Sequence, residues 1–279
     1  MPIMNIVVWD VNHGNSIWIQ TPNNKYVLID CGSNDTTNFS PARYLKSEGR
    51  SIDYLIVSHP HTDHIQDIEN IINHNKPPML DRPKLDLERI LEANPEGDEG
   101  IIRNYFDFQE QYGFETSDEN NPEYKSWGAG VSFHNFNPNE DDSNLNNLGI
   151  ATFVNFGGFT LLCPGDIEEN GWKRLLAQSN FVNWLKKTNF LIASHHGRNT
   201  GLYSKIFEYF TPKLTIVSDG RFRETSATDA YSKITEGWDV NKRDTKDKIK
   251  RYVLTTRNDG PIGINVNVSD NTYVDIAID

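Results

Sequence analysis

The sequence predicts a mixed α/β protein with many short strands, and three observations support this. The apolar segments are short, rich in aromatic and β-branched residues, and separated by turn residues, as at Asn12–Asn15. Between them lie segments whose apolar residues recur at helical spacing. Several apolar runs end directly in histidine or aspartate clusters, for example at Ser58–His64. In α/β sheets the carboxyl ends of strands carry the functional groups.

The N-terminal part alternates predicted strands with predicted helices. A helix is expected over Pro41–Gly49, because Ser40 can serve as its N-cap and Gly49 can end it. Helical spacing also occurs over Ile65–Asn73. The expected strands are Asn5–Val11, Ser16–Gln20, Tyr26–Asp30 and Tyr54–Ser58.

The pattern loosens between residues 75 and 130, a stretch rich in Pro, Asp, Glu and Asn. Amphipathic pieces remain at Leu85–Ala93 and Ile101–Tyr112. We interpret the stretch as an elaborated insertion with some helix, and a disordered loop is the alternative that its composition allows.

Order returns in the C-terminal half. The expected strands are Val131–Phe136, Ile150–Phe156, Phe159–Cys163, Phe190–Ala193, Leu214–Ser218, Tyr252–Thr255, Gly263–Val268 and Thr272–Ile278. The expected helices are Ile167–Gln178, Tyr203–Phe210 and Thr228–Glu236. The mixed-charge segment Asn241–Arg251 is interpreted as a solvated helix face, with contact to a nucleic-acid backbone as the alternative.

Charge and cysteine content exclude several classes of protein. The 279 residues carry a formal net charge of −12, which argues against holding nucleic acid mainly through a basic surface but allows a local cationic or metal-filled cleft. Cys31 and Cys163 are the two cysteines, too few for a disulfide scaffold or a cysteine-rich zinc finger. One bridge between them is arithmetically open, while free core thiols are the expectation.

Targeting signals are not expected either. The N-terminus lacks a basic region, its apolar stretch is very short, and no apolar run is long enough to span a bilayer. The prediction is a cytoplasmic protein in a reducing compartment, without membrane contact.

The strongest functional signal is His59-x-His61-x-Asp63-His64. At an extended strand end, side chains two apart share a face, so His59 and His61 can grip one metal ion. The chain then turns, and Asp63 and His64 can face a second ion. Imidazole and carboxylate ligands suit zinc, manganese or iron.

Two further strand ends complete the constellation. Asp166 follows an apolar strand at Pro-Gly-Asp and can bridge two metals. His195 and His196 follow another at Ser-His-His-Gly. The other histidines are expected to be ordinary surface or core histidines; they are His13, His74 and His134.

Taken together, these segments resemble the metallo-β-lactamase-fold hydrolases, and in particular stand-alone relatives of the soluble hydrolase domain of the ComEC/Rec2 competence proteins. The similar segments are Asp10–Ser16, Leu28–Gly32, Ser58–His64, Asn146–Gly149, Gly157–Asp166, Ser194–Gly197 and Tyr252–Ile264. The resemblance implies an α/β (α+β) chain folded as a four-layer αββα sandwich. It further implies one hydrolase domain over 1–279, elaborated by the insertion at about 75–130, with the site at one edge between the sheets.

The chain also departs from the family pattern. Asn12 and His13 replace Gly-Gln in the first turn, which would place His13 at the site entrance, where it could contact substrate. Gly149 replaces the usual serine, and the insertion is longer than usual. Asn146 occupies the place where many relatives carry a histidine ligand, which favours manganese over a closed zinc site.

The resemblance implies a role for each residue in a site with two divalent metal ions, manganese or zinc. His59 and His61 would hold the first, and Asp63, His64 and one of the two adjacent histidines the second, with His196 favoured. Asp166 and a hydroxide would bridge them. Besides Asp63, the expected catalytic residue is His195, as a phosphate contact or general acid. Asp30, Asn15 and the His13–Ser16 turn would orient ligands, and Asn146 is a weak ligand or a substrate contact.

Three functions remain open. The leading hypothesis is a phosphodiesterase, specifically a nuclease acting on DNA. The second is a small-molecule hydrolase of a cyclic nucleotide, a phosphocholine ester or a lactone. The third is an effector subunit of a bacterial defence assembly that docks a protein partner through the insertion. Lys173, Arg198 and Arg221 are phosphate partners in the first hypothesis and otherwise solvated surface charges.

Overall fold

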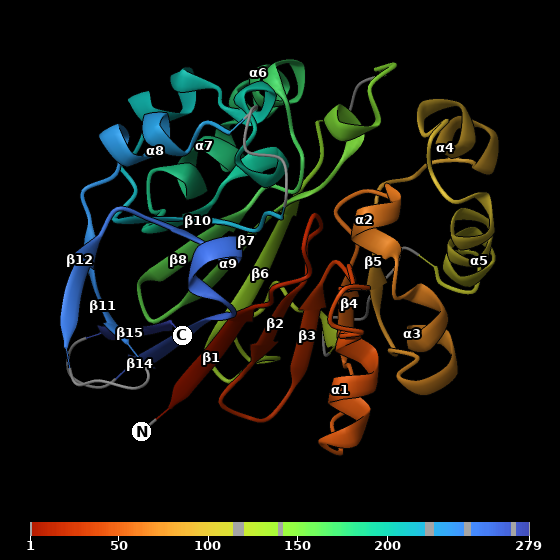
Figure 1. The fold of residues 1–279 in the computed structure, drawn as a ribbon, viewed down its shortest axis with the longest axis horizontal. Helices are drawn as coiled ribbons and strands as arrows, with labels where there is room; N and C mark the ends of the chain where they lie inside the picture. Colours follow the sequence, from red (N-terminus) through yellow and green to blue (C-terminus); the bar gives the residue numbers. More distant parts are fainter. Residues whose placement is uncertain are drawn as a thin grey trace.

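Two β-sheets pack face to face with helices on their outer faces in the computed structural model (Figure 1). The structure describes residues 2–113, 120–138, 142–220, 226–242, 247–268 and 272–278. This arrangement confirms the predicted α/β class and the αββα sandwich. None of the described helices is long and apolar enough to cross a membrane.

The first sheet has nine strands in the order β12-β11-β15-β14-β1-β2-β3-β4-β5. Strands β3, β4 and β5 run parallel, so their carboxyl ends meet at one edge. The strands are β1 Ile3–Val8, β2 Ile17–Gln20, β3 Tyr26–Ile29, β4 Tyr54–Ile56, β5 Leu80–Asp81, β11 Trp238–Lys242, β12 Lys248–Arg251, β14 Ile262–Val268 and β15 Thr272–Ile278.

The second sheet has six strands in the order β13-β10-β9-β8-β7-β6. Strands β8, β9, β10 and β13 run parallel, and again their carboxyl ends meet at one edge. The strands are β6 Val131–Phe136, β7 Ala151–Phe156, β8 Phe159–Cys163, β9 Phe190–Ile192, β10 Leu214–Val217 and β13 Val253–Thr255.

The main core lies between the two sheets. Strand β1 shows why: Met4, Ile6 and Val8 are fully buried toward the second sheet, while the residues between them face outward. This alternation follows from the period of two along a strand. Both cysteines are buried and free, as expected.

Helices cover the outer faces. On the first sheet lie α1 Pro41–Ser47, α2 Thr62–Ile65, α3 Ile68–His74, α4 Leu87–Ala93 and α5 Glu99–Gln109, and on the second α6 Glu169–Leu176, α7 Ser179–Leu185 and α8 Thr228–Ile234 (Figure 1). The short helices are η2 Leu145–Leu148, η3 Ser194–Gly197, η4 Asn199–Gly201, η5 Ser204–Glu208 and α9 Thr256–Asp259. Helix α7 and strand β5 were not among the sequence expectations.

The stretch from 75 to 130 contains packed helices where the structure describes it. Asp86 caps α4 and Asp98 caps α5, because each carboxylate accepts a hydrogen bond from a backbone N–H of the first turn. Ile102, Tyr105 and Phe108 on one face of α5 are buried against the first sheet's outer core. The two amphipathic pieces thus form helices, and residues 114–119 lie outside the described part.

Two sequence expectations were wrong. The described residues of the segment Asn241–Arg251 form strands and not a helix. Strand β11 pairs antiparallel with β12, with Trp238 opposite Arg251 and Asn241 opposite Lys248, so the charged residues of β12 lie at the edge of the first sheet. Charged side chains hide the strand period there, because β12 is mostly exposed. The segment Tyr203–Phe210 contains only the 3₁₀ helix η5.

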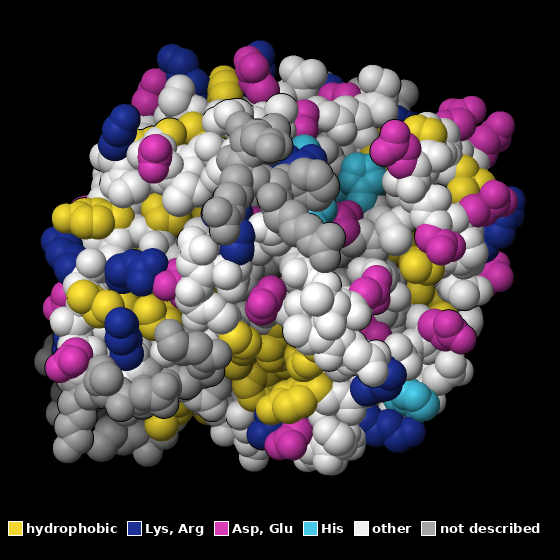
Figure 2. Space-filling model, in the orientation of Figure 1, with side chains coloured by type: hydrophobic (Ala, Val, Ile, Leu, Met, Phe, Trp, Pro, Cys, Tyr) yellow, Lys and Arg dark blue, Asp and Glu magenta, His cyan; other side chains and the backbone are white. Residues whose placement is uncertain are grey.

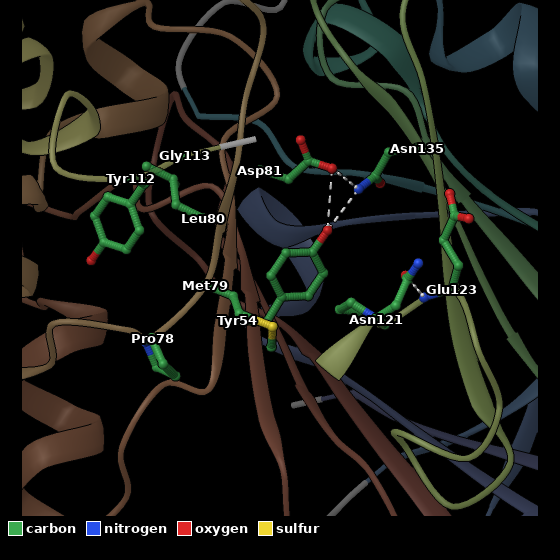
Figure 3. A pocket seen from close by; sticks show the side chains of 11 residues that line it. Tyr54, Pro78, Met79, Leu80, Asp81, Tyr112, Gly113, Asn121, Glu123 and Asn135 are labelled. Atoms are coloured by element: carbon green, nitrogen blue, oxygen red, sulfur yellow. Dashed lines mark hydrogen bonds between the residues drawn. The ribbon is translucent and has the colours of Figure 1, made fainter. Parts of the chain in front are cut away.

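A polar network joins the two sheets at the β5 edge, beside a cavity of about 310 Å³ (Figure 3). Asn135 of β6 donates from Nδ2 to Asp81 Oδ2 (2.6 Å) and to the Tyr54 hydroxyl (2.8 Å), and Thr152 donates to Asn135 Oδ1 (2.7 Å). Burial and the neighbouring Asp81 raise the pKa of Tyr54, so its hydroxyl stays protonated.

Candidate metal centre

The predicted metal motif follows strand β4. The Ser58 backbone N–H donates to Asp30 Oδ1 at 2.6 Å, which ties the extended end of this strand to that of β3. The chain then turns at His61 into α2, which carries Asp63 and His64 inward. The motif's side chains therefore gather at the edge where the parallel strands end.

Four acceptor groups from three segments meet at this edge: Asp63, His64, Asp166 and His196. Their ligand atoms all lie within 4.8 Å of one another. The His196 Nε2 atom is 3.2 Å from His64 Nε2, 3.1 Å from Asp63 Oδ2 and 3.4 Å from Asp166 Oδ2. His64 Nε2 lies 3.2 Å from Asp166 Oδ1. Asp166 and His196 are thus brought to the motif as predicted.

The hydrogen bonds behind the two imidazoles leave their Nε2 atoms as acceptors. His64 Nδ1 lies 2.8 Å from Asp30 Oδ2, and His196 Nδ1 lies 2.9 Å from the Ser218 carbonyl oxygen. Both partners can only accept, so each Nδ1 is the donor and each neutral ring presents a lone pair at Nε2. Two carboxylates facing these two nitrogens require positive charge, which either protons on the Nε2 atoms or a metal ion can supply.

The spacing of the four groups also fits a metal ion. A tetrahedral ion with ligands at about 2.0–2.1 Å holds them about 3.3 Å apart. The cluster's own separations range from 3.1 to 3.4 Å around His196 and Asp166. Histidine and carboxylate donors suit zinc, manganese or iron. The residues present therefore fit a divalent metal.

His59 and His61 form a second pair beside this cluster. His59 Nε2 lies 2.9 Å from His61 Nδ1 and 3.9 Å from Asp166 Oδ2. The other oxygen of Asp166 faces His64, so this carboxylate lies between the pair and the four-residue cluster. Asp166 is therefore positioned between the two groups, and its role as a bridge between two metal ions stays a prediction.

Charges in the cluster depend on one another. Burial alone would raise the pKa of Asp166, but His196 and His64 beside it hold that pKa well below its usual range. Burial alone would lower the pKa of His196, but Asp166 and Asp63 raise it to about 10. Burial lowers the pKa of His59, and its histidine neighbours lower it further. The carboxylates thus attract positive charge, and protons and a metal ion compete for the same nitrogens.

The backbone is strained where it presents the histidines. His195 and His196 both adopt left-handed conformations, with φ of 51° and 52°, and Asp30 has φ 59°. Such a conformation costs about 1–3 kcal/mol at a non-glycine residue and persists where the surroundings enforce it. Here the two left-handed residues turn adjacent side chains to different partners.

His195 contacts Glu168 and is not one of the four residues of the cluster. Its Nδ1 lies 2.8 Å from Glu168 Oε1, and its Nε2 lies 3.7 Å from Asp166 Oδ2. Glu168 also accepts from the Asn146 side chain at 3.4 Å, and Asn146 Oδ1 is buried without a hydrogen-bond partner in the described part of the chain. Sequence reasoning missed Glu168, although its place two residues after Asp166 was a usable signal.

Asp30 and Asn15 lie behind the metal cluster, as predicted. Asn15 Nδ2 and Ser58 Oγ each donate to Asp30 Oδ2 at 2.8 Å, the same oxygen that His64 contacts. Asp30 is fully buried, so these donors and the Ser58 N–H fix its carboxylate. A histidine held this way keeps its ring orientation and tautomer.

His13 lies at the edge of the cluster, as its position in the first turn predicted. Its ring centre is 4.4 Å from that of His196, and its Nε2 is 3.6 Å from Asp63 Oδ2. Arg198 reaches over the same place: Nη2 lies 3.1 Å from His13 Nε2, and Nη1 lies 3.3 Å from His195 Nε2. Burial and the nearby His196 lower the pKa of His13 to about 3, so its ring is neutral.

Other sequence candidates lie elsewhere. His134 stacks on Trp184 with ring centres 4.0 Å apart, and Lys173 pairs with Glu169 on an exposed helix face. A Cβ atom at Gly149 would lie 3.1 Å from the Ser58 carbonyl oxygen, so the absent serine side chain has little room. Arg221 lies outside the described residues.

A family comparison matches the part of the chain that carries the metal motif. Residues 9–80 match the profile of the metallo-β-lactamase superfamily. The matched segment contains β2 to β4 and the whole His59–His64 motif. Over these residues the chain is therefore similar to metallo-β-lactamase superfamily proteins, and the four-residue cluster to which they contribute fits a divalent metal.

A longer part of the chain is similar in sequence to a curated protein. The chain is 25% identical over 235 residues to ComE operon protein 3 of Bacillus subtilis (strain 168), which covers 76% of this chain and 28% of that protein. The chain therefore spans less than a third of this relative's length. This match confirms the resemblance to the competence proteins that the motifs indicated.

Two solved structures are also similar to this chain, both at TM-scores below 0.5. A diphosphatase from the PhnP family is similar with 13% identity and a TM-score of 0.48, covering 95% of this chain and all of that one. A metallo-β-lactamase with a HARLDQ motif from Cronobacter sakazakii is similar with 17% identity and a TM-score of 0.37, covering 59% of this chain and 64% of that one.

Proposed function

We propose that this chain is a metal-dependent phosphodiesterase that acts on nucleic acid with two divalent ions, manganese or zinc. The observation that carries the proposal is the four-residue cluster, in which two imidazole Nε2 atoms and two carboxylates lie within 4.8 Å of one another. His59 and His61 would hold one ion, and Asp63, His64 and His196 the other, with Asp166 shared. Divalent ions supply a nucleophile at neutral pH and stabilise charge on phosphoryl oxygens.

The protein's own residues orient and surround the reacting groups. Glu168 holds His195 through Nδ1, which leaves Nε2 directed toward the cluster, 3.7 Å from Asp166 Oδ2. His195 Nε2, which also accepts a hydrogen bond from Arg198, is therefore the atom that would contact a substrate oxygen or, once protonated, pass a proton to the leaving oxygen. Asp30 and the Ser218 carbonyl oxygen keep the Nε2 atoms of His64 and His196 directed inward.

Arg198 favours an anionic phosphoester over a neutral lactone. A guanidinium only donates hydrogen bonds, so the Nε2 atoms of His13 and His195 both accept from it. This places a permanent cation at the edge of the metal cluster. A phosphodiester oxygen gains charge-assisted hydrogen bonds from such a group, whereas a lactone does not carry the matching charge.

The choice of nucleic acid over a small phosphodiester rests on the resemblance to the competence-protein hydrolase domain. The net charge of −12 works against a long polyanion away from the site, so a small-molecule substrate is the second candidate. For either substrate we propose a cytoplasmic location. Binding of a protein partner through the 75–130 insertion is a separate proposal.

Cleavage assays distinguish these candidates. Circular DNA, linear DNA, bis-p-nitrophenyl phosphate and a lactone are each incubated with the protein and Mn²⁺, Mg²⁺, Zn²⁺ or EDTA. We expect metal-dependent cleavage of DNA and of the model phosphodiester, loss of both in an Asp63→Ala/His64→Ala variant, and retention in His134→Gln, which changes a histidine outside the site. Turnover of the lactone but of no phosphodiester by metal-loaded protein would contradict the proposal.

A further inference from the structure

An aromatic pocket of about 630 Å³ lies on the outer face of the first sheet, beside α1. Its floor is formed by Trp9 and Trp18, and its walls by Phe39, Tyr44 and Arg50. We call it the aromatic pocket. Figure 2 shows an apolar hollow on the face where β1, β2 and α1 lie in Figure 1, with histidine side chains above it on the same face. The volume is in the range of small-ligand sites.

The aromatic rings pack closely and are fixed in place. Trp9 stacks with Trp18 at a ring separation of 6.4 Å, and it contacts Phe39 and Tyr44 edge-on at 5.5 and 5.9 Å. The Arg50 guanidinium lies over Trp18, 5.0 Å from its ring centre. Tyr44 is 40% exposed, so part of its ring is available to a ligand. Arg50 disfavours a cationic occupant, since like charges repel.

The upper rim of the pocket is polar and leads to the metal centre. Asn34, Asn38 and Asp10 line it. Asn34 is buried and hydrogen-bonded to Asn12 and to the Asp10 carbonyl oxygen, so the exposed Asn38 is the amide that can pair with the hydrogen-bonding edge of a nucleobase. Asn34 accepts from Asn12 Nδ2 at 2.7 Å, and Asn12 precedes His13, which lies 3.6 Å from Asp63 at the cluster. The rim and the metal centre thus share one turn of the chain.

We propose that the aromatic pocket binds a base of single-stranded nucleic acid whose backbone lies at the metal centre. The inference rests on the proposed function and names its substrate as single-stranded. Planar aromatic walls give stacking that any base can use, and the exposed Asn38 amide gives a hydrogen-bond partner. Arg50, which also pairs with Glu48 at 3.9 Å, adds a guanidinium that a neighbouring phosphate can contact. An apolar protein segment would use the aromatic floor but not the polar rim.

The test compares two strands of equal length, a phosphorothioate oligothymidylate and an abasic strand. Binding is followed by the fluorescence of the protein's tryptophans, in EDTA and again with Mn²⁺. The variants are Tyr44→Ala, in the pocket, and Tyr252→Ala, an equally exposed tyrosine (42%) outside it. Stacking of one base on an aromatic ring contributes about 5- to 150-fold in affinity. Tyr44→Ala should therefore lower the affinity for the base-bearing strand by a factor in that range.

We expect wild-type protein and Tyr252→Ala to prefer the base-bearing strand and Tyr44→Ala to lose that preference. Equal binding of the two strands by wild type, or equal losses in both variants, would overturn the proposal. Hydrolysis of bis-p-nitrophenyl phosphate, which has no base, is measured on the same samples. If the protein does not hydrolyse this compound but still prefers the base-bearing strand, the proposed function is wrong and the pocket proposal stands. If it hydrolyses the compound but shows no preference for the base-bearing strand, only the pocket proposal is wrong.

Discussion

Replacing Asp30 by asparagine should weaken metal binding while leaving the fold intact. Asp30 does not contact the expected metal position; it fixes His64 from behind at 2.8 Å. Asparagine is nearly the same size and tolerates the left-handed backbone at φ 59°. The change therefore tests the hydrogen bond and the charge rather than the packing.

The magnitude follows from the donors around this carboxylate. Its Oδ2 accepts from Asn15, Ser58 and His64, so an NH₂ group there would face donors. His64 can relieve the conflict by moving its proton to Nε2, which removes the lone pair that the metal needs. Loss of such a supporting group costs about 10- to 100-fold in metal affinity, or about 1.4–2.7 kcal/mol.

Competition titration of Zn²⁺ or Mn²⁺ against a chromophoric chelator measures the effect, and urea unfolding measures stability. Asp67→Asn is the matched control, because Asp67 is also a buried carboxylate, bound by Ser40 and the Ala42 N–H but by none of the four cluster residues. Both variants should lose about 1–3 kcal/mol of stability. Equal metal affinity in Asp30→Asn and Asp67→Asn would refute the reasoning.

Further predictions concern stability. Trp172 is fully buried and donates a hydrogen bond to the Gly201 carbonyl oxygen at 3.1 Å. The substitution Trp172→Ala should lower the free energy of unfolding by about 3–5 kcal/mol, as measured by urea denaturation. A loss below about 1 kcal/mol would show that the core between the second sheet and its helices is loosely packed. Burial and the neighbouring lysines lower the pKa of His134 to about 4. As pH falls from 6.5 toward 4, the free energy of unfolding of the wild type should therefore decrease by about 1 kcal/mol relative to that of His134→Gln. Unfolding free energies of the two proteins that change in parallel with pH would contradict this. A metal at about 100 times its dissociation constant should stabilise the chain by about 2.7 kcal/mol, seen as a higher melting temperature that the Asp63→Ala/His64→Ala variant lacks.

Much of the site could be predicted because its residues follow strands directly. The His59–His64 motif sits at the end of β4, Asp166 follows β8 and His196 follows β9, so parallel strand pairing alone brings them to one edge. The order of these segments along the chain was enough to indicate the superfamily. The αββα layering came from the resemblance, not from the pattern of apolar residues.

Other features depend on contacts that no local pattern encodes. The choice between His195 and His196 is made by two left-handed backbone positions, which turn one ring to Glu168 and the other to the cluster. Arg198 meets His13 across 185 positions of sequence. Strand β12 is mostly exposed and charged, so its period of two was invisible.

Metal stoichiometry tests the central claim most directly. Equilibrium dialysis against Mn²⁺ or Zn²⁺, followed by elemental analysis, is performed on wild type, His196→Ala and His134→Gln. The account predicts two ions per chain for wild type and His134→Gln, and the loss of at least one in His196→Ala. A wild-type chain that binds no divalent ion, or a His196→Ala variant that binds two with unchanged affinity, would contradict it.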